Sequence, residues 1–361
     1  MINQERLLAT LFDLIRIDSP SGEEEEMARH VSGKLESMGF SVERDDYRNV
    51  IARRGEGTPL ILSAHMDTVE PGRGIKPRIE GDRIVSDGTT ILGGDCKAGV
   101  AAILEGLESV LEDGGETIAL EVILTREEEI GLMGARKLDL AKVRGKEAVV
   151  FDGVGPASQI MSASPTYVGF DIDITGRAAH AGLEPEKGVS AVRIAGEIIT
   201  RLPNGRLNDE TTFNIGKMEG GQVRNAVPEK GTLVGEFRSR DPEQIVKLGL
   251  EVETVVEQVR KLFPDAAVEF VMDTHFHGYE LTEKDPAVKR VASALRGLGL
   301  EPDLQVSGGG TDGNVFRSHG LSAAVVGMAD YNAHTKKEYV VIPELVDAAR
   351  LCEALVRGQG V

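Results

Sequence analysis

The chain has 361 residues, of which 41% are hydrophobic, enough to build two domains with cores of ordinary size. Its 41 basic and 59 acidic residues give a net charge of −18, which disfavours a nucleic-acid binder because such proteins usually carry a basic face. Two cysteines, no signal-peptide pattern and no apolar run near the roughly 20 residues that cross a bilayer predict a soluble, cytoplasmic protein without nucleic-acid or membrane partners.

The first part of the chain is predicted to contain helices and strands of an α/β domain. Apolar spacing predicts a helix over residues 7–17. Ser21 and Glu24 match a capping box, so a second helix should begin after Ser21 and end near Met38. Extended segments are then expected at 42–53, at 60–64 and, as a hairpin around Asp87-Gly88, at 84–92.

Apolar strands continue to alternate with helices further along the chain. A helix is expected over 98–111 and buried strands over 118–124 and 148–151. The same alternation resumes after about Tyr279, with helices at 286–298 and 344–357 and a strand at 323–326. This order predicts an α/β fold with a mainly parallel or mixed sheet that is covered on both faces.

The segment in between follows another pattern. Strands are predicted at 167–174, 211–217, 232–238 and 267–272, with helices at 189–202 and 243–263. The order β-α-β-β-α-β is the split βαβ of a ferredoxin-like sandwich. We therefore expect an inserted α+β lid or dimerisation domain over 164–276. The first domain is then discontinuous and consists of 1–163 and 277–361.

Side chains that suit metal binding follow several of the hydrophobic runs. His65 and Asp67 come just after the strand Leu60-Ile61-Leu62 and, two residues apart, point the same way on an extended backbone. The imidazole could then bind a metal while the carboxylate accepts its other ring N–H. An ordinary polar strand end is the alternative interpretation of this pair.

Acidic residues end two further runs. Asp95 follows Leu92-Gly93-Gly94 and precedes a helix, where by itself it is more typical of an N-cap. Glu127, Glu128 and Glu129 follow a buried strand, and the carboxyl ends of strands are where α/β sheets place ligand sites. Neighbouring carboxylates diverge, so one could bind a metal while another accepts a proton from water. A solvated turn is the alternative for such an acidic run.

Two more candidates complete the set. Asp152 follows the strand Ala148-Val149-Val150-Phe151, and His334 lies in a loop after the strand at 323–326. Two histidines and three carboxylates can hold two divalent cations and leave one carboxylate for proton transfer. This combination is typical of a metal-assisted hydrolase.

Taken together, these segments resemble the zinc-dependent peptidase family that includes peptidase T, the glutamate carboxypeptidases, the aminoacylases and succinyl-diaminopimelate desuccinylase. The resemblance covers nearly the whole chain. It rests on segments that occur in the family's order: Ser63-Ala64-His65-Met66-Asp67, Gly94-Asp95-Cys96-Lys97, Glu127-Glu128-Glu129-Ile130-Gly131, Phe151-Asp152-Gly153 and Asn332-Ala333-His334. It implies a mixed-sheet di-zinc exopeptidase-like catalytic domain with an inserted ferredoxin-like dimerisation domain.

The resemblance also implies individual roles. His65 and Asp152 would bind one Zn²⁺, Glu129 and His334 the other, and Asp95 would bridge both, with Co²⁺ or Mn²⁺ as substitutes. Asp67 would orient His65, and Glu128 would be the general base. The chain departs from the family pattern at Glu127 and at Cys96, where relatives have Asp, and a cis peptide is expected at Asp95–Cys96.

In the inserted domain, His180 resembles a histidine that reaches the site of the other subunit in a homodimer. The residues that match the family's substrate contacts are Asn225, Arg238, Gly310 and Thr311. The segment Lys97-Ala98-Gly99 looks closest to peptidase T and its tripeptidase-like relatives, which implies an aminopeptidase that cleaves short peptides. The alternatives are an N-acyl amino acid deacylase or carboxypeptidase on the same scaffold, and a metal-free binding or regulatory relative.

Overall fold

The computed structural model describes residues 1–359 and divides the chain into two compact units. The first unit comprises Met1–Ala163, Glu280–Ser307 and the chain from Thr311 onward; the second comprises Ser164–Tyr279 and Gly308–Gly310. Residues 277–279 and the short stretch Gly308–Gly310 thus group with the second unit, whereas we expected them in the first domain. The stretch at 308–310 packs there because Gly310 lies against the Phe276 ring, where a Cβ would come within 2.2 Å of the ring.

The first unit is built on a mixed sheet with the strand order β1-β2-β6-β3-β7-β16-β17-β5-β4. These strands are β1 (Ser41–Arg44), β2 (Val50–Arg54), β3 (Leu60–His65), β4 (Arg78–Glu80), β5 (Arg83–Val85), β6 (Leu120–Thr125), β7 (Glu147–Val154), β16 (Ser322–Tyr331) and β17 (Tyr339–Val341). Three shorter strands lie off this path: β8 (Gln159–Ser164), β14 (Tyr279–Glu280) and β15 (Asp303–Val306).

The four central strands run parallel. β3 pairs in parallel with both β6 and β7, and β7 pairs in parallel with β16. Their carboxyl ends therefore meet at one edge of the sheet, which is where ligand sites form in this kind of sheet. The expected α/β fold with a mixed sheet is confirmed.

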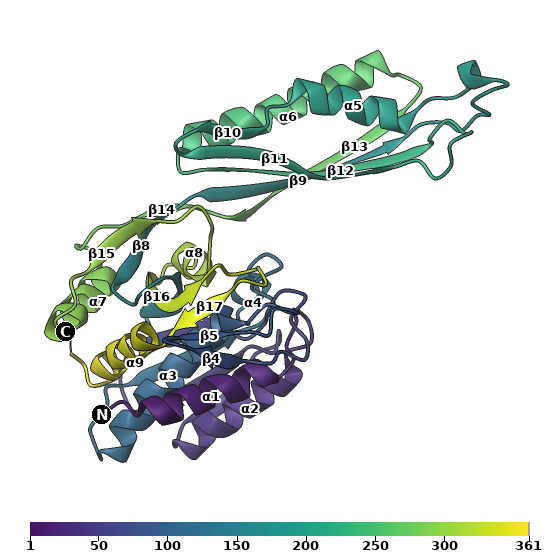
Figure 1. The fold of residues 1–361 in the computed structure, drawn as a ribbon. Coiled ribbons are helices and arrows are strands. Elements are labelled where there is room, and N and C mark those ends of the chain that lie inside the picture. The colour runs from purple at the N-terminus through teal and green to yellow at the C-terminus, as the bar shows by residue number, and fades with distance from the viewer. Residues whose placement is uncertain (360–361) are drawn as a thin grey trace. The chain divides into compact units, whose positions relative to one another are not determined.

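Helices cover the sheet on both sides (Figure 1). They are α1 (Gln4–Arg16), α2 (Glu25–Ser37), α3 (Gly94–Glu112), α4 (Met133–Arg136), α7 (Pro286–Gly297), α8 (Asp312–Ser318) and α9 (Ile342–Val356), with a 3₁₀ turn at Leu140–Lys142. α3 is apolar on most of its surface because it packs against α1, α9 and the sheet. Within residues 1–359, no helix is both long and apolar enough to span a membrane.

Three local predictions were wrong. The single strand expected at 42–53 is the antiparallel pair β1–β2, which a turn with Arg48 at φ 73° connects. The hairpin turns at Gly81-Asp82, between β4 and β5, rather than at Asp87-Gly88. The capping box does not form, because Ser21 donates its hydroxyl to Asp67 and Glu24 accepts the N–H of Glu127.

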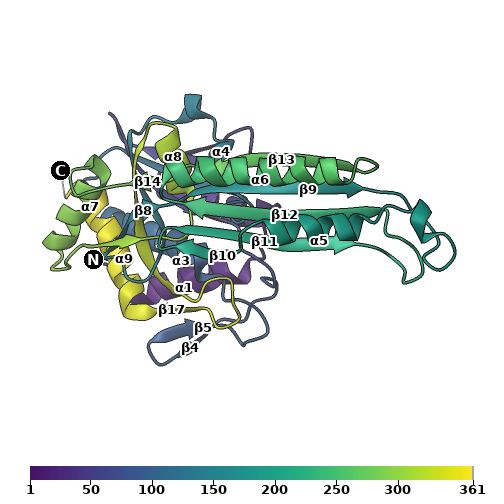
Figure 2. The same cartoon turned by 90° about the horizontal axis from the view of Figure 1, so that it is seen from above.

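The second unit is a five-stranded antiparallel sheet in the order β10-β11-β12-β9-β13, with two helices on one face (Figure 2). Its elements are β9 (Thr166–Thr175), a 3₁₀ turn at Pro185–Lys187, α5 (Ala191–Arg201), β10 (Gly205–Asn208), β11 (Thr211–Gly220), β12 (Lys230–Ser239), α6 (Pro242–Leu262) and β13 (Ala267–Phe276). β9 shows why the sheet is covered on one face only: Val168, Phe170, Ile172 and Ile174 are buried in the core, and the residues between them are not.

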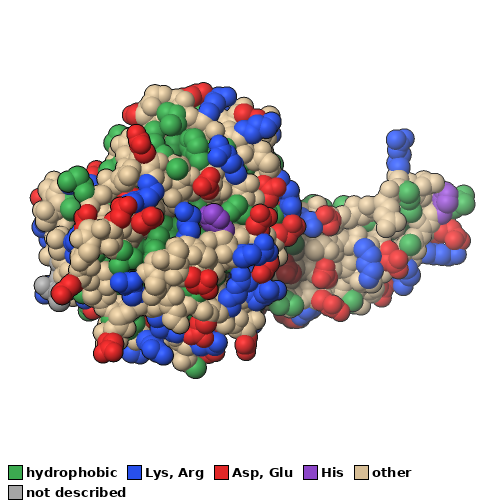
Figure 3. Space-filling model, turned by 90° about the horizontal axis from the view of Figure 1, so that it is seen from below, with side chains coloured by type: hydrophobic (Ala, Val, Ile, Leu, Met, Phe, Trp, Pro, Cys, Tyr) green, Lys and Arg blue, Asp and Glu red, His purple; other side chains and the backbone are tan. Residues whose placement is uncertain are grey.

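Figure 3 shows how the charged side chains are distributed on one face of the protein. On the face shown in Figure 3, acidic and basic side chains are interspersed, with hydrophobic side chains in small islands between them. Although the chain has a net charge of −18, the acidic side chains on this face do not form one continuous patch.

Candidate metal and catalytic site

The carboxyl ends of the parallel strands bring together a first group of side chains that could bind a metal. His65 is the last residue of β3, and its Nε2 lies 3.1 Å from Oδ1 of Asp95 and 3.5 Å from Oδ1 of Asp152. The ligand atoms of His65, Asp95, Cys96 and Asp152 all lie within 4.8 Å of one another. This group is nearly closed to solvent.

A second group shares Asp95 with the first. Nε2 of His334 lies 3.3 Å from Oδ2 of Asp95 and 2.9 Å from Oε2 of Glu129. The ligand atoms of Asp95, Glu129 and His334 also lie within 4.8 Å of one another. The two carboxylate oxygens of Asp95 thus face different histidines, as a carboxylate that bridges two cations must.

The buried carboxylates of the two ligand groups would be stabilised by bound cations. Burial raises the pKa of Asp152 and raises that of Glu129 to about 7. Hydrogen bonds to Asp95 and Glu129 raise the pKa of His334 to about 10. Three carboxylates buried at one place repel one another and are poorly solvated, and divalent cations remove both costs. The donor set of imidazole nitrogens and carboxylate oxygens fits zinc.

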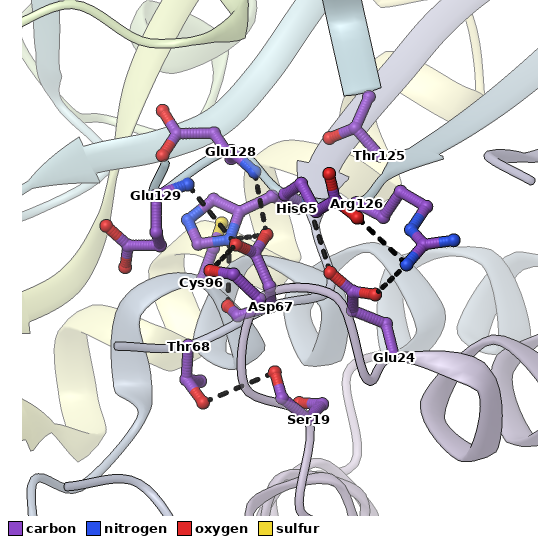
Figure 4. Close-up of polar contacts among 12 residues, drawn as sticks. Ser19, Glu24, His65, Asp67, Thr68, Cys96, Thr125, Arg126, Glu128 and Glu129 are labelled. Carbon is purple, nitrogen blue, oxygen red and sulfur yellow. Dashed lines mark hydrogen bonds and ion pairs between the residues drawn. The ribbon is translucent and has the colours of Figure 1, made fainter. Parts of the chain in front are cut away.

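Asp67 contacts both His65 and the turn formed by residues 127–129 (Figure 4). Its Oδ1 is 3.3 Å from Nδ1 of His65, which also lies 3.0 Å from the main-chain oxygen of Asp67. The same carboxylate accepts the main-chain N–H groups of Glu128 at 2.9 Å and Glu129 at 3.2 Å, and the Ser21 hydroxyl at 2.7 Å. Asp67 therefore holds a candidate metal ligand, His65, and at the same time the turn formed by residues 127–129, which we call the glutamate turn.

The glutamate turn distinguishes Glu127 from Glu128. Glu127 has a left-handed backbone conformation, with φ 53°, and its carboxylate accepts the hydroxyl of Tyr47 and pairs with Arg126. The Glu128 carboxylate points away from Asp67 and has no hydrogen bond to the residues drawn in Figure 4. Its side chain is 8% exposed, and burial, followed by the nearby Asp152 carboxylate, raises its pKa well above the ordinary value. Glu127 is thus held by other side chains, whereas the Glu128 carboxylate lies buried near Asp152.

Cys96 is arranged differently from a typical metal ligand. Its thiol donates to the main-chain oxygen of Phe151 at 2.8 Å, and burial raises the pKa of the thiol. The expected cis peptide between Asp95 and Cys96 is present.

Sequence reasoning missed several residues of this site. Asp312, at the start of α8, is 1% exposed, accepts the Thr125 hydroxyl, and has its pKa raised to about 7 by burial. Glu338 is 2% exposed and bonds to the main chain around Asp95. The available signals were the glycine-rich turn before Asp312 and the acidic residue four positions after His334.

Most of the expected substrate contacts lie in the second unit. Nδ1 of His180 accepts the N–H of Gly182 at 3.2 Å, and the main-chain oxygen of Asn225 accepts the N–H of Ala181 at 3.0 Å, so His180 and Asn225 lie on paired loops. The Arg238 guanidinium stacks over Tyr167 at 4.4 Å and pairs with Glu236 at 2.9 Å.

Gly310 also belongs to the second unit, whereas Thr311 belongs to the first. Thr311 is the N-cap of α8, where its hydroxyl accepts the N–H of Gly313 at 3.1 Å. The metal-type residues and Glu128 are therefore brought together within the first unit, and Asn225, Arg238, His180 and Gly310 are placed in the second.

A model of peptidase family M20/M25/M40 matches residues 61–358, most of the chain. The chain belongs to this family. Two solved structures are similar to this M20 peptidase over its whole length. The aminopeptidase PepT of Bacillus cereus is 34% identical, with 99% of this chain and 98% of that chain covered and a TM-score of 0.85. A tripeptidase of Staphylococcus aureus is 32% identical, with 99% and 100% covered and a TM-score of 0.89.

A relative known by sequence is also similar. Peptidase T of an Exiguobacterium species is 27% identical over 96% of this chain and 96% of its own length. The M20 peptidase is therefore a peptidase T-like hydrolase, and the resemblance inferred from its sequence is confirmed.

Proposed function

We propose that this M20 peptidase is a two-metal aminopeptidase that releases the N-terminal residue of short peptides, tripeptides above all. The observation that carries the proposal is the placement of Asp95, whose two oxygens lie 3.1 Å and 3.3 Å from the histidines of two separate ligand groups. The similar proteins support the substrate class, because one is described as an aminopeptidase and another as a tripeptidase.

Each ligand group would hold one Zn²⁺. His65 and Asp152 would bind the first ion, Glu129 and His334 the second, and Asp95 both. When bound, such ions supply Lewis acidity that polarises a peptide carbonyl and makes water a nucleophile near neutral pH. Co²⁺ or Mn²⁺ would fit the same nitrogen and oxygen donors.

Glu128 would move the proton. It is buried beside the ligand groups, and its main chain is held by Asp67 at 2.9 Å. As general base it accepts a proton from the attacking water, and as general acid it then gives that proton to the leaving amine. Glu127 is not suited to this role because Tyr47 and Arg126 already bind its carboxylate.

The second unit would supply substrate contacts and the dimer interface. Arg238 offers a guanidinium for a substrate carboxylate, Asn225 an amide, and Gly310 and Thr311 a loop for the peptide. β13 is an edge strand, and an edge strand presents unpaired main-chain groups to another chain. Exposed Val246, Leu250 and Val271 supply apolar surface on α6 and β13. Through such a homodimer, His180 of one subunit would serve the site of the other and stabilise the oxyanion.

One experiment tests the proposed function directly. Purified enzyme, with its metal content measured by elemental analysis, is assayed with tripeptides, with the same tripeptides blocked at the N-terminus, and with N-acetyl and N-succinyl amino acids. We expect two metals per chain and cleavage of the free tripeptides only. Hydrolysis of the N-acyl amino acids without cleavage of tripeptides would replace the aminopeptidase by a deacylase, and release of the C-terminal residue would indicate a carboxypeptidase.

A further inference from the structure

Glu338 binds the main chain that carries Asp95. Its Oε2 accepts the N–H groups of Leu92 at 2.7 Å and Gly93 at 2.9 Å, and its Oε1 accepts the N–H of Asp95 at 3.1 Å. The side chain is 2% exposed, so these three bonds are shielded from water. Hydrogen bonds from N–H groups to an ionised carboxylate are among the stronger ones in proteins.

The backbone at this place needs such support. Gly93 has φ 73°, and Asp95 and Cys96 have non-helical backbone angles although they stand at the start of α3. The N–H groups at such a helix start lack partners within the helix, and Glu338 supplies acceptors for those of Gly93 and Asp95. This carboxylate therefore fixes the main chain from which Asp95 presents its oxygens to His65 and His334.

Glu338 stands on the same turn as His334. The Glu338 N–H donates to the main-chain oxygen of Thr335 at 3.1 Å, and the Thr335 hydroxyl donates to the oxygen of Asn332 at 2.8 Å. β16 and β17 pair at the base of this turn, where the rings of Tyr331 and Tyr339 stack at 5.1 Å. These contacts make the turn compact and fix the positions of His334 and Glu338 relative to each other.

The first residue of α3 lies close against the end of β16 and against Glu338. A Cβ on Gly94 would come within 2.4 Å of Oδ1 of Asp330 and 3.3 Å of Oε1 of Glu338. Only glycine permits this approach, which brings the main chain within reach of the Glu338 carboxylate.

We propose that Glu338 is a positioning residue that connects the His334 turn to the main chain of Asp95 and so couples the two ligand groups. Asp95 belongs to both groups, whereas His334 belongs to one. Loss of Glu338 should therefore weaken both metal positions together, although its side chain belongs to neither ligand group. The inference rests on the proposed two-metal site, and its test separates the two.

The test compares metal-free wild type, Glu338→Gln and Glu121→Gln, each titrated with Co²⁺ and followed by visible absorption. Glu121 is the matched control: it is a fully buried carboxylate that accepts the N–H groups of Arg144 at 3.0 Å and Gly145 at 2.8 Å in the same unit. In Glu338→Gln, an amide N–H₂ replaces one of the two accepting oxygens and faces a main-chain N–H, so at least one of the three hydrogen bonds is lost. We expect both Co²⁺ dissociation constants to rise about 10- to 100-fold in Glu338→Gln, the range seen for residues that orient metal ligands. Those of Glu121→Gln should stay at the wild-type values.

Hydrogen exchange of the metal-free proteins is the second readout. The peptide that covers residues 92–96 should lose protection in Glu338→Gln and keep it in Glu121→Gln. Unchanged exchange there and unchanged Co²⁺ binding, or a loss of affinity equal in the two variants, would overturn the proposal. If wild type bound no metal, the proposed function would fail, and the exchange comparison would decide the role of Glu338 by itself.

Two further variants keep the test decisive. Gly94→Ala leaves every carboxylate in place but displaces the segment, and it should reproduce the loss at both positions if Glu338→Gln does not fold. His334→Ala should weaken one position only. Equal loss at both positions in His334→Ala would contradict the assignment of the coupling to Glu338.

Discussion

The carboxylate of Asp67 accepts the main-chain N–H of Glu128 at 2.9 Å. The same carboxylate lies 3.3 Å from Nδ1 of His65. The candidate general base and a candidate metal ligand therefore depend on one side chain, so a change at Asp67 should disturb both.

Asp67→Asn tests this dependence. Its amide can accept fewer hydrogen bonds and directs an N–H₂ group toward donors, so the glutamate turn and the His65 ring both lose their support. We expect about 10- to 100-fold weaker metal binding together with a lower kcat. Ser21→Ala removes one of the four bonds to this carboxylate and should have a smaller effect, measured by the same metal titration and peptide assay. Equal effects of the two variants would argue against the central role of Asp67.

Glu128→Gln tests the proton transfer. Glutamine keeps the size of the side chain but cannot accept the proton, so we expect kcat to fall by about a hundredfold or more. Metal content should remain unchanged. Glu127→Gln is the matched control, because its carbonyl can still accept the Tyr47 hydroxyl. If Glu127→Gln proved the crippling change, the assignment of the base would be wrong by one position.

Removal of the metals should inactivate and destabilise the protein. A ligand present at about 1,000 times its dissociation constant stabilises the folded state by roughly 4 kcal/mol per site. Dialysis against a chelator should thus abolish peptidase activity and lower Tm, and added Zn²⁺, Co²⁺ or Mn²⁺ should restore both. Full activity in protein shown by elemental analysis to contain no metal would exclude the two-metal mechanism.

Mixing inactive subunits tests the role of His180. If His180 serves the site of the other subunit, a heterodimer of His180→Ala and Glu128→Gln chains has one site with both groups intact. Activity should reappear after subunit exchange, which a tag on one chain can verify. No recovery in a verified heterodimer would mean that His180 acts within its own chain or not at all.

Two half-buried histidines outside the site predict a pH effect on stability. Burial lowers the pKa of His30 in α2 and of His319 at the end of α8. A lowered folded-state pKa means that the neutral form is favoured on folding. The resulting stability is fully present above the unfolded pKa of about 6.5 and is lost as pH falls from there through the lower folded-state pKa. Between pH 8 and 5.5, Tm should fall less in His30→Gln/His319→Gln than in wild type when both are metal-free. An equal slope would show that these histidines do not couple to folding.

The sequence by itself determined the α/β architecture and indicated the candidate metal-binding residues. Parallel strands such as β3 and β7 show as apolar runs because both of their faces are buried, and the residues that follow them must meet at one edge of the sheet. His65, Asp152 and His334 follow such apolar runs, whereas Asp95 and the choice of Glu129 within the acidic run came from the resemblance to the family. These five side chains do come together in the structure. The α5 and α6 segments were likewise visible from helical periodicity.

Only the tertiary structure decided which partners the neighbouring carboxylates have. Glu127 and Glu128 look alike in sequence, but Tyr47, from a distant loop, binds one and leaves the other free. Ser21 and Glu24 match a helix cap, yet Ser21 donates its hydroxyl to Asp67 and Glu24 accepts the N–H of Glu127. Glu338 was missed although it follows His334 by four positions, because its partners Leu92 and Asp95 lie more than 240 residues away in the chain. The physical reason is common to all three cases: periodicity reports burial along one segment, whereas hydrogen-bond partners are chosen between segments that only folding brings together.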